Sequence, residues 1–549
     1  MLEPQMSWDE AVAILTAPGA DFETVEEMVL GESMLVFKNR ARTLPDLLRS
    51  TAERFGNADC HVFDGGPRAT FTDVADRAAS VALALSRDHG IGPGDRVAIL
   101  AANCMEWIDA FWAVVSLGGI VVAMNGWWTA EEVDYGMALT SPKLLVVDRP
   151  RLERMSEPPD VPTIVIEDDF ADLLGTDASA GLPEVEIAED DPAAILFTSG
   201  TTARPKGAVT SHRCFGAFVS MSHVGAAINA LRFPPTDPAP APAGLATSPL
   251  FHVSGLHTSA ITGMASGVKS VWPAGRFDAD NIMRLTAEEK ISHWGGVTTH
   301  LWRLVQSPNM ANYDLSSVRS VGGGGSVWSP ELQRTIRQAL PNASHSVMVG
   351  YGLTESGGLA CTAHDELLRR HPDSVGRPIP TVEVAIKDPS DVDLPEGEEG
   401  EVCLRGPGII PGYWNNPEAT RLALRPGRWL RTGDIGRLVD GVLYLSARKG
   451  DMIIRGGENI SPVEIENRLD EHPFVVEAAV IGVEHRELGQ EVKAIVVHAP
   501  GAPVTSEELS AFVGQALSYY KVPSIWEIRT EPLPRNITGK VLKRELLEG

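Results

Sequence analysis

The stretch that decides the fold is Ile195-Leu-Phe-Thr-Ser-Gly-Thr-Thr-Ala-Arg-Pro-Lys-Gly-Ala-Val209. It passes from an apolar, strand-like segment into a loop rich in hydroxyls, glycine and cations, and becomes apolar again at Ala208. Hydroxyls, free backbone N–H groups and a lysine are the donors that phosphate oxygens require. The spacing excludes a Walker loop, because Lys206 precedes Gly207 rather than Ser or Thr. Taken alone, the loop is also consistent with a solvated turn between two strands.

Composition narrows the possible partners. The chain has 549 residues, of which 43% are hydrophobic and 22% charged, so it should fold into several globular units. A formal net charge of −26 argues against nucleic acid as the main partner and against binding to an anionic membrane surface. A polyanionic ligand would therefore need a locally basic pocket or a metal ion.

The cysteines and the apolar runs indicate the compartment. The five cysteines are scattered without CxxC pairs, so a disulfide framework is not expected. The N-terminal residues lack the basic start and apolar core of a secretory signal. No uninterrupted apolar run approaches the length of about 18 residues that a membrane span needs. We expect a soluble, cytoplasmic protein without a membrane span.

Short apolar runs alternate with helical patterns through the first part of the chain. Residues 96–100, 120–124 and 143–147 have the pattern of strands, and residues 105–117 have that of a helix. This alternation is typical of βαβ units, which form parallel sheets covered by helices on both faces. Ligands of such sheets bind beyond the carboxyl ends of the strands, so the polar loops there should converge on one crevice.

The pattern changes near residues 437–451, which predicts a domain boundary. We expect an N-terminal extension (1–43), a large domain (44–449) and a small domain (450–549). The predicted fold class is α/β, with a large multi-sheet N-terminal domain and a small, mobile α+β C-terminal domain. Gly450 would supply the backbone freedom of a hinge between the two.

Four further polar motifs follow the phosphate-type loop. Residues 350–358 place an acid among hydroxyls and glycines, a setting that suits Mg²⁺. Residues 429–436 contain an Asp that could accept both ribose hydroxyls, and residues 447–462 form a charged junction with a Gly-Gly turn. Residues 534–543 put Lys540 in a glycine-containing loop. Each motif alone is consistent with an ordinary turn or a solvated charge.

Together and in this order, the five motifs resemble those of the adenylate-forming superfamily, which includes acyl-CoA synthetases, coumarate ligases and luciferases. The resemblance extends from about Thr43 to Leu547. It implies an enzyme that binds ATP, Mg²⁺, a small carboxylic acid and coenzyme A. The carboxylate would attack the α-phosphorus to give acyl-AMP and pyrophosphate, and the thiol would then displace AMP. A rotation of the small domain would separate the two steps.

The resemblance also assigns the site residues. The residues expected to bind ATP are Thr198, Ser199, Gly200, Thr201, Thr202, Lys206, Gly324, Gly325, Ser326, Tyr351, Gly352, Thr354, Asp434 and Arg448. Gly456 and Gly457 would border the thiol arm of coenzyme A, and Glu355 with Thr198 would hold Mg²⁺. The residues expected to take part in catalysis are Lys540, Thr198, Glu355 and His252. A general base is not required, because the carboxylate is already ionised at neutral pH.

Three positions depart from the family pattern. Ala203 stands where the family usually has Gly, which is costly only if its φ is positive. Gly450 replaces a Lys or Asp at the hinge. Arg455 precedes the Gly-Gly turn, where we expect it to meet a coenzyme A phosphate or to face solvent.

The residues near the acyl group indicate the acid. A largely neutral His252 stands where amino-acid-activating relatives have an Asp, so an amino acid substrate is not expected. Gly357 and Gly358 favour an acid of some depth, and we expect a medium- or long-chain fatty acid. An aryl or polycyclic acid remains open, as does an acyl-AMP ligase that loads a carrier protein. A non-catalytic nucleotide-binding regulator would not need Lys540. Whether the chain forms a homodimer is also open.

Overall fold

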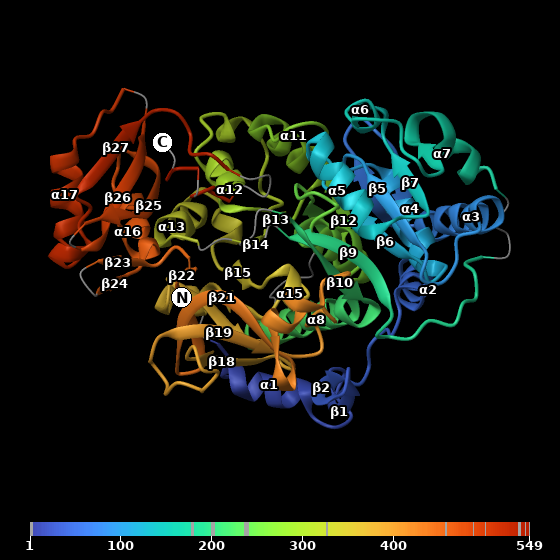
Figure 1. The fold of residues 1–549 in the computed structure, drawn as a ribbon, viewed down its shortest axis with the longest axis horizontal. Helices are drawn as coiled ribbons and strands as arrows, with labels where there is room; N and C mark the ends of the chain where they lie inside the picture. Colours follow the sequence, from blue (N-terminus) through green and yellow to red (C-terminus); the bar gives the residue numbers. More distant parts are fainter. Residues whose placement is uncertain are drawn as a thin grey trace.

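The structure, a computed structural model, consists of two large sheets and a smaller lobe at the C-terminal end (Figure 1). The residues that it describes are 4–176, 181–198, 204–234, 241–325, 328–448, 450–455, 458–486 (458 and 459 by their backbone only), 488–499, 501–535, 540–543 and 545–547. In Figure 1 the C-terminal lobe lies apart from the lobe of the first large sheet, and the strands of the second lie between and below them.

The first large sheet has six strands and is mainly parallel. Its strands, in spatial order, are β10 (Lys206–Ser211), β9 (Pro192–Thr198), β6 (Ile120–Ala123), β5 (Arg96–Leu100), β7 (Leu144–Val147) and β8 (Thr163–Val165). Only β10 is antiparallel to its neighbour. The first predicted βαβ unit is present: β5 and β6 are parallel, and α4 (Met105–Ser116) connects them.

Both faces of this sheet are buried, because strand side chains alternate between the faces. Val97 and Ile99 of β5 belong to one hydrophobic core, and Ala98 and Leu100 belong to another. The first core also holds α2 (Leu44–Phe55), which begins after the N-cap Thr43 as the sequence predicts, and α3 (Phe71–His89). A doubly covered sheet of this kind presents its polar loops only at its ends.

The second large sheet combines a parallel half with an antiparallel half. The parallel half contains β3 (Asp59–Phe63), β12 (Lys269–Trp272), β11 (Ala243–Leu245), β13 (His293–Gly295), β14 (Ser320–Gly324) and β15 (Val347–Tyr351). The antiparallel half continues through β16 (Cys361–His364), β17 (Ser374–Pro378), β22 (Val442–Arg448), β21 (Trp429–Val439), β19 (Gly400–Arg405) and β18 (Glu383–Lys387). The sequence analysis did not predict this antiparallel half.

The chain leaves the second sheet after β22 and enters the small lobe. A five-stranded sheet there contains β23 (Ile453–Arg455), β24 (Glu458–Ile460), β25 (Val475–His485), β26 (Gly489–His498) and β27 (Ile525–Arg529). Two helices, α16 (Pro462–Asp470) and α17 (Ser506–Gly514), contribute to the core of the lobe. These elements match the predicted α+β unit. Within the described residues, a Cβ at Gly450 would meet nothing within 4 Å.

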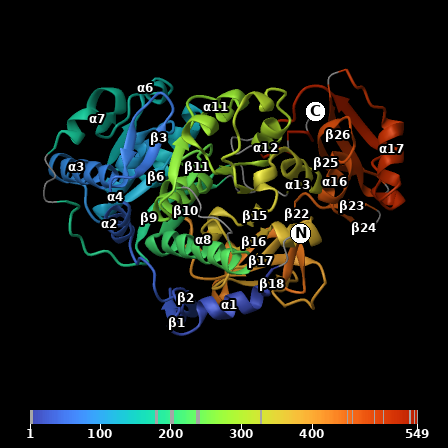
Figure 2. The same ribbon diagram turned by 180° about the vertical axis from the view of Figure 1, so that it is seen from behind.

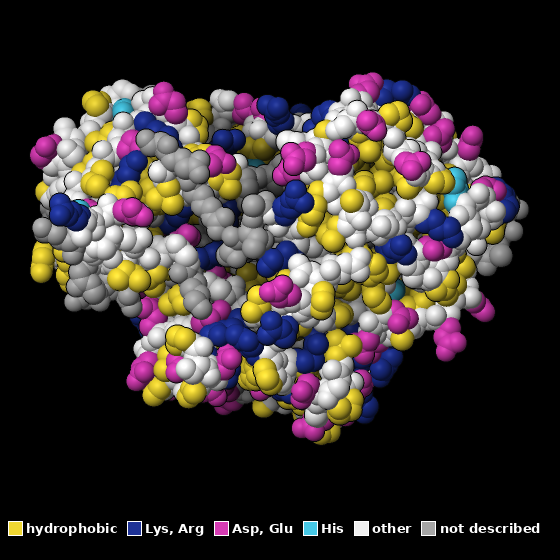
Figure 3. Space-filling view, in the orientation of Figure 1, with side chains coloured by type: hydrophobic (Ala, Val, Ile, Leu, Met, Phe, Trp, Pro, Cys, Tyr) yellow, Lys and Arg dark blue, Asp and Glu magenta, His cyan; other side chains and the backbone are white. Residues whose placement is uncertain are grey.

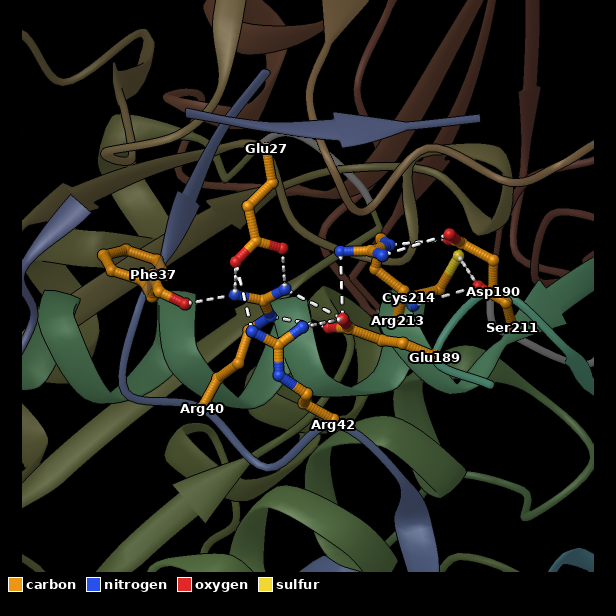
Figure 4. A network of polar contacts seen from close by, with 9 residues as sticks. All are labelled: Glu27, Phe37, Arg40, Arg42, Glu189, Asp190, Ser211, Arg213 and Cys214. Atoms are coloured by element: carbon orange, nitrogen blue, oxygen red, sulfur yellow. Dashed lines mark hydrogen bonds and ion pairs between the residues drawn. The ribbon is translucent and has the colours of Figure 1, made fainter. Parts of the chain in front are cut away.

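The N-terminal extension folds into α1 (Trp8–Thr16) and a hairpin of β1 (Thr24–Val29) and β2 (Glu32–Phe37). A network of ion pairs connects this extension to the large domain (Figure 4). Arg40 pairs with Glu27 at 2.7 Å and with Glu189 at 2.6 Å, and Glu189 also pairs with Arg213 at 3.1 Å. Arg213 lies at the start of α8 (His212–Arg232), directly after β10.

Helix α8 is long and apolar enough to cross a membrane by length and composition. In the structure just over half of the window that passes this test is buried, and the helix lies above the N-terminal extension in the view from behind (Figure 2). Its residues pack into two hydrophobic cores of the large domain, so its apolar composition is explained by its place inside the protein.

Candidate active site

The predicted site residues gather where the ends of several strands meet. Thr198 ends β9, Gly324 ends β14 and Tyr351 ends β15. In Figure 3, Lys and Arg side chains are numerous near the centre of the face, although the whole chain is acidic. Gly324 and Gly350 are partners on neighbouring strands, so the ends of β14 and β15 lie side by side.

Tyr413 connects the phosphate-type loop with the acidic loop. Its hydroxyl donates a 2.8 Å hydrogen bond to Oε1 of Glu355, and Nζ of Lys206 lies 5.1 Å from the centre of its ring. The backbone N–H of Trp414 also donates to the carbonyl of Gly207 at 2.7 Å. The sequence analysis missed Tyr413, because nothing in the tyrosine's own surroundings in the sequence distinguishes it from a packed aromatic residue.

A second group of side chains forms the predicted ribose site. Tyr351 is 7% exposed, and its hydroxyl donates a 2.8 Å hydrogen bond to Oδ2 of Asp434. Oδ1 of Asp434 lies 3.2 Å from Nε of Arg448, which faces it across the β21–β22 pair. Burial and the neighbouring carboxylate raise the pKa of Tyr351 well above its usual value, so its hydroxyl keeps its proton.

Lys540 reaches this group from the small lobe. A bridge between Arg535 and Val541 closes the loop that carries it. Partial loss of hydration, followed by the charge of Arg448, lowers the pKa of Lys540, whereas Asp434 and Asp451 oppose that effect. In this arrangement of the two lobes the ammonium of the exposed Lys540 therefore lies near the ribose-type residues of the large domain.

Glycines leave a narrow, flat space at the end of β14. A Cβ at Gly324 would lie 2.5 Å from the carbonyl oxygen of Gly350 on the next strand, so a side chain cannot be accommodated there. Gly325 follows with a φ of +82°, a conformation that favours glycine. A planar ring could lie against such a side-chain-free strand end.

The predicted acyl side lies beside α8. His252 caps α9 (Val253–Gly255), and its Nδ1 accepts from the backbone N–H of Ser254 at 3.2 Å. Burial lowers the pKa of His252 to about 4, so it is neutral at pH 7, with its proton on Nε2. A Cβ at Gly358 would lie 2.7 Å from Val253 and 3.0 Å from the ring of Phe218 on α8. The sequence analysis missed Phe218.

Metal binding would depend on a few ligands from the protein. Among the described residues there is no group of three or more His, Cys, Asp or Glu side chains that could hold a metal ion. The hydroxyl of Thr198 is buried, and it finds no hydrogen-bond partner in the described structure. One carboxylate, Glu355, and one free hydroxyl suit Mg²⁺ that takes most of its oxygens from phosphates and water.

Some of the predicted residues cannot be placed. Ser199, Gly200, Thr201, Thr202, Ala203, Ser326, Gly456 and Gly457 lie outside the described residues. Arg455 is described and does not simply face solvent, because its Nε lies 2.5 Å from Oε1 of Glu491; contact with a coenzyme A phosphate stays a prediction. The cause is local: β23, which ends at Arg455, pairs with β26, which carries Glu491.

Two parts of the chain match models of known protein families. Residues 48–414 match the model described as AMP-binding enzyme, and residues 464–540 match that of the AMP-binding enzyme C-terminal domain. The chain belongs to the AMP-binding enzymes, the adenylate-forming acyl-CoA synthetases. The predicted family and fold class are therefore confirmed, including the small C-terminal domain.

Relatives of this AMP-binding enzyme match it over most of its length. A long-chain-fatty-acid–CoA ligase of Bacillus subtilis is 30% identical, and the match covers 92% of this chain and 94% of that protein. 4-Coumarate–CoA ligase 2 of Oryza sativa is also 30% identical, with 98% and 95% covered. The ATP-bound structure of MatB from Rhodopseudomonas palustris is 28% identical, with a TM-score of 0.79 over 92% of this chain and 98% of that one. An adenylate-forming CoA ligase is thus supported, whereas these relatives leave its acid open.

Proposed function

We propose that this enzyme converts a carboxylic acid, ATP and coenzyme A into acyl-CoA, AMP and pyrophosphate through an acyl-AMP intermediate. The observation that carries the proposal is Lys540 of the small lobe, whose ammonium lies within the electrostatic reach of Arg448 and Asp434 of the large domain. Phosphate-binding strand ends alone would serve any nucleotide. An ammonium delivered from a second domain suits a reaction in which charge builds up on phosphoryl oxygens.

In the first half-reaction a carboxylate oxygen of the acid bonds to the α-phosphorus, and the bond to the pyrophosphate oxygen breaks. Lys206 and the hydroxyl of Thr198 would hold the leaving pyrophosphate, and Thr354 would contact the α-phosphate. Lys540 would stabilise the negative charge that develops on the phosphoryl and carboxyl oxygens. Asp434 would bind the ribose hydroxyls, which fixes the position of the α-phosphate relative to the acid.

Mg²⁺ would neutralise charge on the phosphates when it is bound. Glu355 is the carboxylate that would hold it, together with Thr198. The 2.8 Å hydrogen bond from Tyr413 keeps one oxygen of Glu355 in place, so the second oxygen is the one suited to the ion. This donor set leaves most of the coordination to the substrate.

In the second half-reaction the sulfur of coenzyme A bonds to the acyl carbon, and AMP leaves. We propose that the small domain turns about Gly450 between the steps, which removes Lys540 and brings Gly456 and Gly457 to the thiol arm. The space around Gly450 supports a hinge there, because no neighbouring atom lies within 4 Å of a Cβ at this position. Domains that alternate between two states commonly turn about a few such residues.

For the acid, we propose a medium- or long-chain fatty acid, the class that the Bacillus relative's name contains. The neutral His252 supports an acid without an ammonium group. An aryl or polycyclic acid is the second candidate, since Phe218 and Val253 close the space beneath Gly358 and would pack well against a ring. The Oryza relative's name contains an acid of the aryl type.

The test is a panel of fatty, aryl and polycyclic acids with Mg-ATP, in which pyrophosphate release and acyl-CoA formation are measured separately. At least one acid should release pyrophosphate, and coenzyme A should then yield the thioester by mass spectrometry. Release of pyrophosphate without a thioester would favour the loading of a carrier protein. A complete absence of release with every acid would contradict the proposal.

A further inference from the structure

Tyr135 contacts the segment that leads from the phosphate-type loop into β10. It lies in α5 (Ala130–Thr140), which connects β6 with β7 of the first large sheet. Its hydroxyl donates a 3.2 Å hydrogen bond to the carbonyl of Pro205, and the guanidinium carbon of Arg204 lies 5.2 Å from the centre of its ring. Both residues stand immediately before Lys206, the first residue of β10. A tyrosine from outside the loop therefore restrains the chain where it enters this strand.

The local sequence explains why α5 presents Tyr135 to this segment. Thr129 caps the helix with a complete capping box, which fixes its first turn. Tyr135 and Leu139 are four residues apart, so they lie on the same face of the helix. The carbonyl of Leu139 accepts from Nδ2 of Asn415 at 3.2 Å. That face of α5 thus contacts two segments of the site, the one before β10 and the one that carries Tyr413.

The start of α5 also contacts β9, the strand that precedes the loop. Trp128 stands directly before the cap of α5, and its ring packs edge to face with that of Phe197 at a centroid distance of 4.7 Å. Gly136 makes room for the indole, because a Cβ there would lie 2.8 Å from it. The two strands that flank the loop are therefore both contacted by one stretch of chain, residues 128–135.

Lys206 is restrained at its backbone and at its ammonium. The carbonyl that Tyr135 binds belongs to the peptide group between Pro205 and Lys206, so this hydrogen bond limits rotation of the backbone next to the lysine. Lys206 is also the partner of Thr198 in the β9–β10 ladder. Its Nζ lies 5.1 Å from the ring centre of Tyr413. A lysine that the protein holds in this way loses less conformational freedom when it binds phosphate.

We propose that Tyr135 is a positioning residue for Lys206: through the carbonyl of Pro205 it fixes the lysine that holds the β- and γ-phosphates of ATP. The inference rests on the proposed function, in which Lys206 contacts the leaving pyrophosphate. Tyr135 acts through Lys206 and does not touch the nucleotide. Its effect should therefore appear with ATP and vanish with AMP, which lacks the two outer phosphates.

The experiment measures the dissociation constants of Mg-ATP and of AMP by calorimetry in the full-length enzyme. Tyr135→Phe removes the hydroxyl and keeps the ring beside Arg204. The dissociation constant of ATP should rise by about fivefold, the equivalent of one neutral hydrogen bond, and that of AMP should stay unchanged. Tyr135→Leu also removes the ring and should weaken ATP binding by about tenfold or more. Tyr313→Phe is the control and should change neither constant, because Tyr313 packs against a hydrophobic core of the second large sheet.

A double-variant cycle tests whether Tyr135 acts through Lys206. Lys206→Ala should weaken the binding of ATP and leave that of AMP unchanged. Adding Tyr135→Phe to Lys206→Ala should cause no further loss, because the side chain that the tyrosine positions is then gone. At saturating ATP, the single-turnover rate of acyl-AMP formation in Tyr135→Phe should stay within about threefold of the wild type, since the bound phosphates return Lys206 to its place.

The outcomes separate this inference from the proposed function. The positioning role is overturned if Tyr135→Phe leaves ATP binding unchanged, weakens ATP and AMP equally, or adds its full loss to that of Lys206→Ala. Acid-dependent pyrophosphate release would uphold the proposed function in each of these cases. If no acid releases pyrophosphate and Lys206→Ala binds ATP as tightly as the wild type, the proposed function and the inference both fall.

Discussion

Lys540 is the residue on which the chemistry depends most. Lys540→Ala should lower the rate of acyl-AMP formation by about a hundredfold or more, because it removes a charge aimed at the transition state. The affinity for ATP should change little. Single-turnover measurement of acyl-AMP is the assay. Lys521→Ala is the matched control, since Lys521 is another small-domain lysine and pairs with Glu464 at 2.6 Å. Equal rates in the two variants would contradict the assignment.

The pH dependence of adenylation should report on the same ammonium. Partial loss of hydration and the charge of Arg448 lower the pKa of Lys540 below its ordinary value of 10.5, and the reaction requires the protonated form. The rate should therefore decline on the alkaline side at a lower pH than an ordinary lysine would give. Lys540→Arg keeps its charge at high pH, so this decline should disappear in that variant. A decline that persists in the Arg variant would assign it to another group.

Single site residues were predicted well where several chemically distinctive residues stand close together in one sequence motif. Asp434, Arg448 and Lys540 were predicted from separate motifs, and the structure brings them together. Tyr413 and Phe218 were missed, because an isolated aromatic residue has the same sequence pattern in a core as in a site. Only their neighbours in space, Glu355 and Gly358, distinguish them.

The N-terminal hairpin offers a test at the scale of the element. Arg40 and Arg42 both pair with Glu27 and Glu189, but their side chains are 3% and 56% exposed. Arg40→Ala removes the buried guanidinium that joins Glu27 to Glu189, while Arg213 still pairs with Glu189, and should destabilise the attachment of β1–β2 by about 2 kcal/mol. Arg42→Ala should cost less than about 1 kcal/mol. Amide hydrogen exchange in β1–β2 measures the difference, and equally fast exchange in both variants would contradict it.

Elements with a clear period were predicted with nearly correct bounds. The strand in β5 and the helix α2 follow from apolar periodicity and from the cap at Thr43. The antiparallel half of the second sheet was not predicted, because its strands come from distant segments such as β17 and β22. Their pairing depends on tertiary contacts, and the periodic pattern of the local sequence does not reveal it. The predicted site depends on that half, since it carries Asp434 and Arg448.

At the scale of the whole molecule, the proposed reaction requires the small domain to adopt two positions relative to the large domain. Gly450→Pro should preserve adenylation and slow thioester formation by tenfold or more, because proline fixes φ at the proposed hinge. Gly450→Ala is the control, since a Cβ meets nothing there and Gly450 does not have a positive φ. Separate rates for acyl-AMP and acyl-CoA formation would show the effect. Equal slowing of both steps by the proline would contradict a hinge at this position.

The most direct test of the central claim follows a carboxylate oxygen. The enzyme is incubated with Mg-ATP, coenzyme A and the best acid of the panel, labelled with ¹⁸O in its carboxyl group. Attack of the carboxylate on the α-phosphorus predicts AMP that carries one labelled oxygen and acyl-CoA that retains the other. Unlabelled AMP, or label recovered in inorganic phosphate instead, would contradict an acyl-AMP intermediate and with it the role assigned to this site.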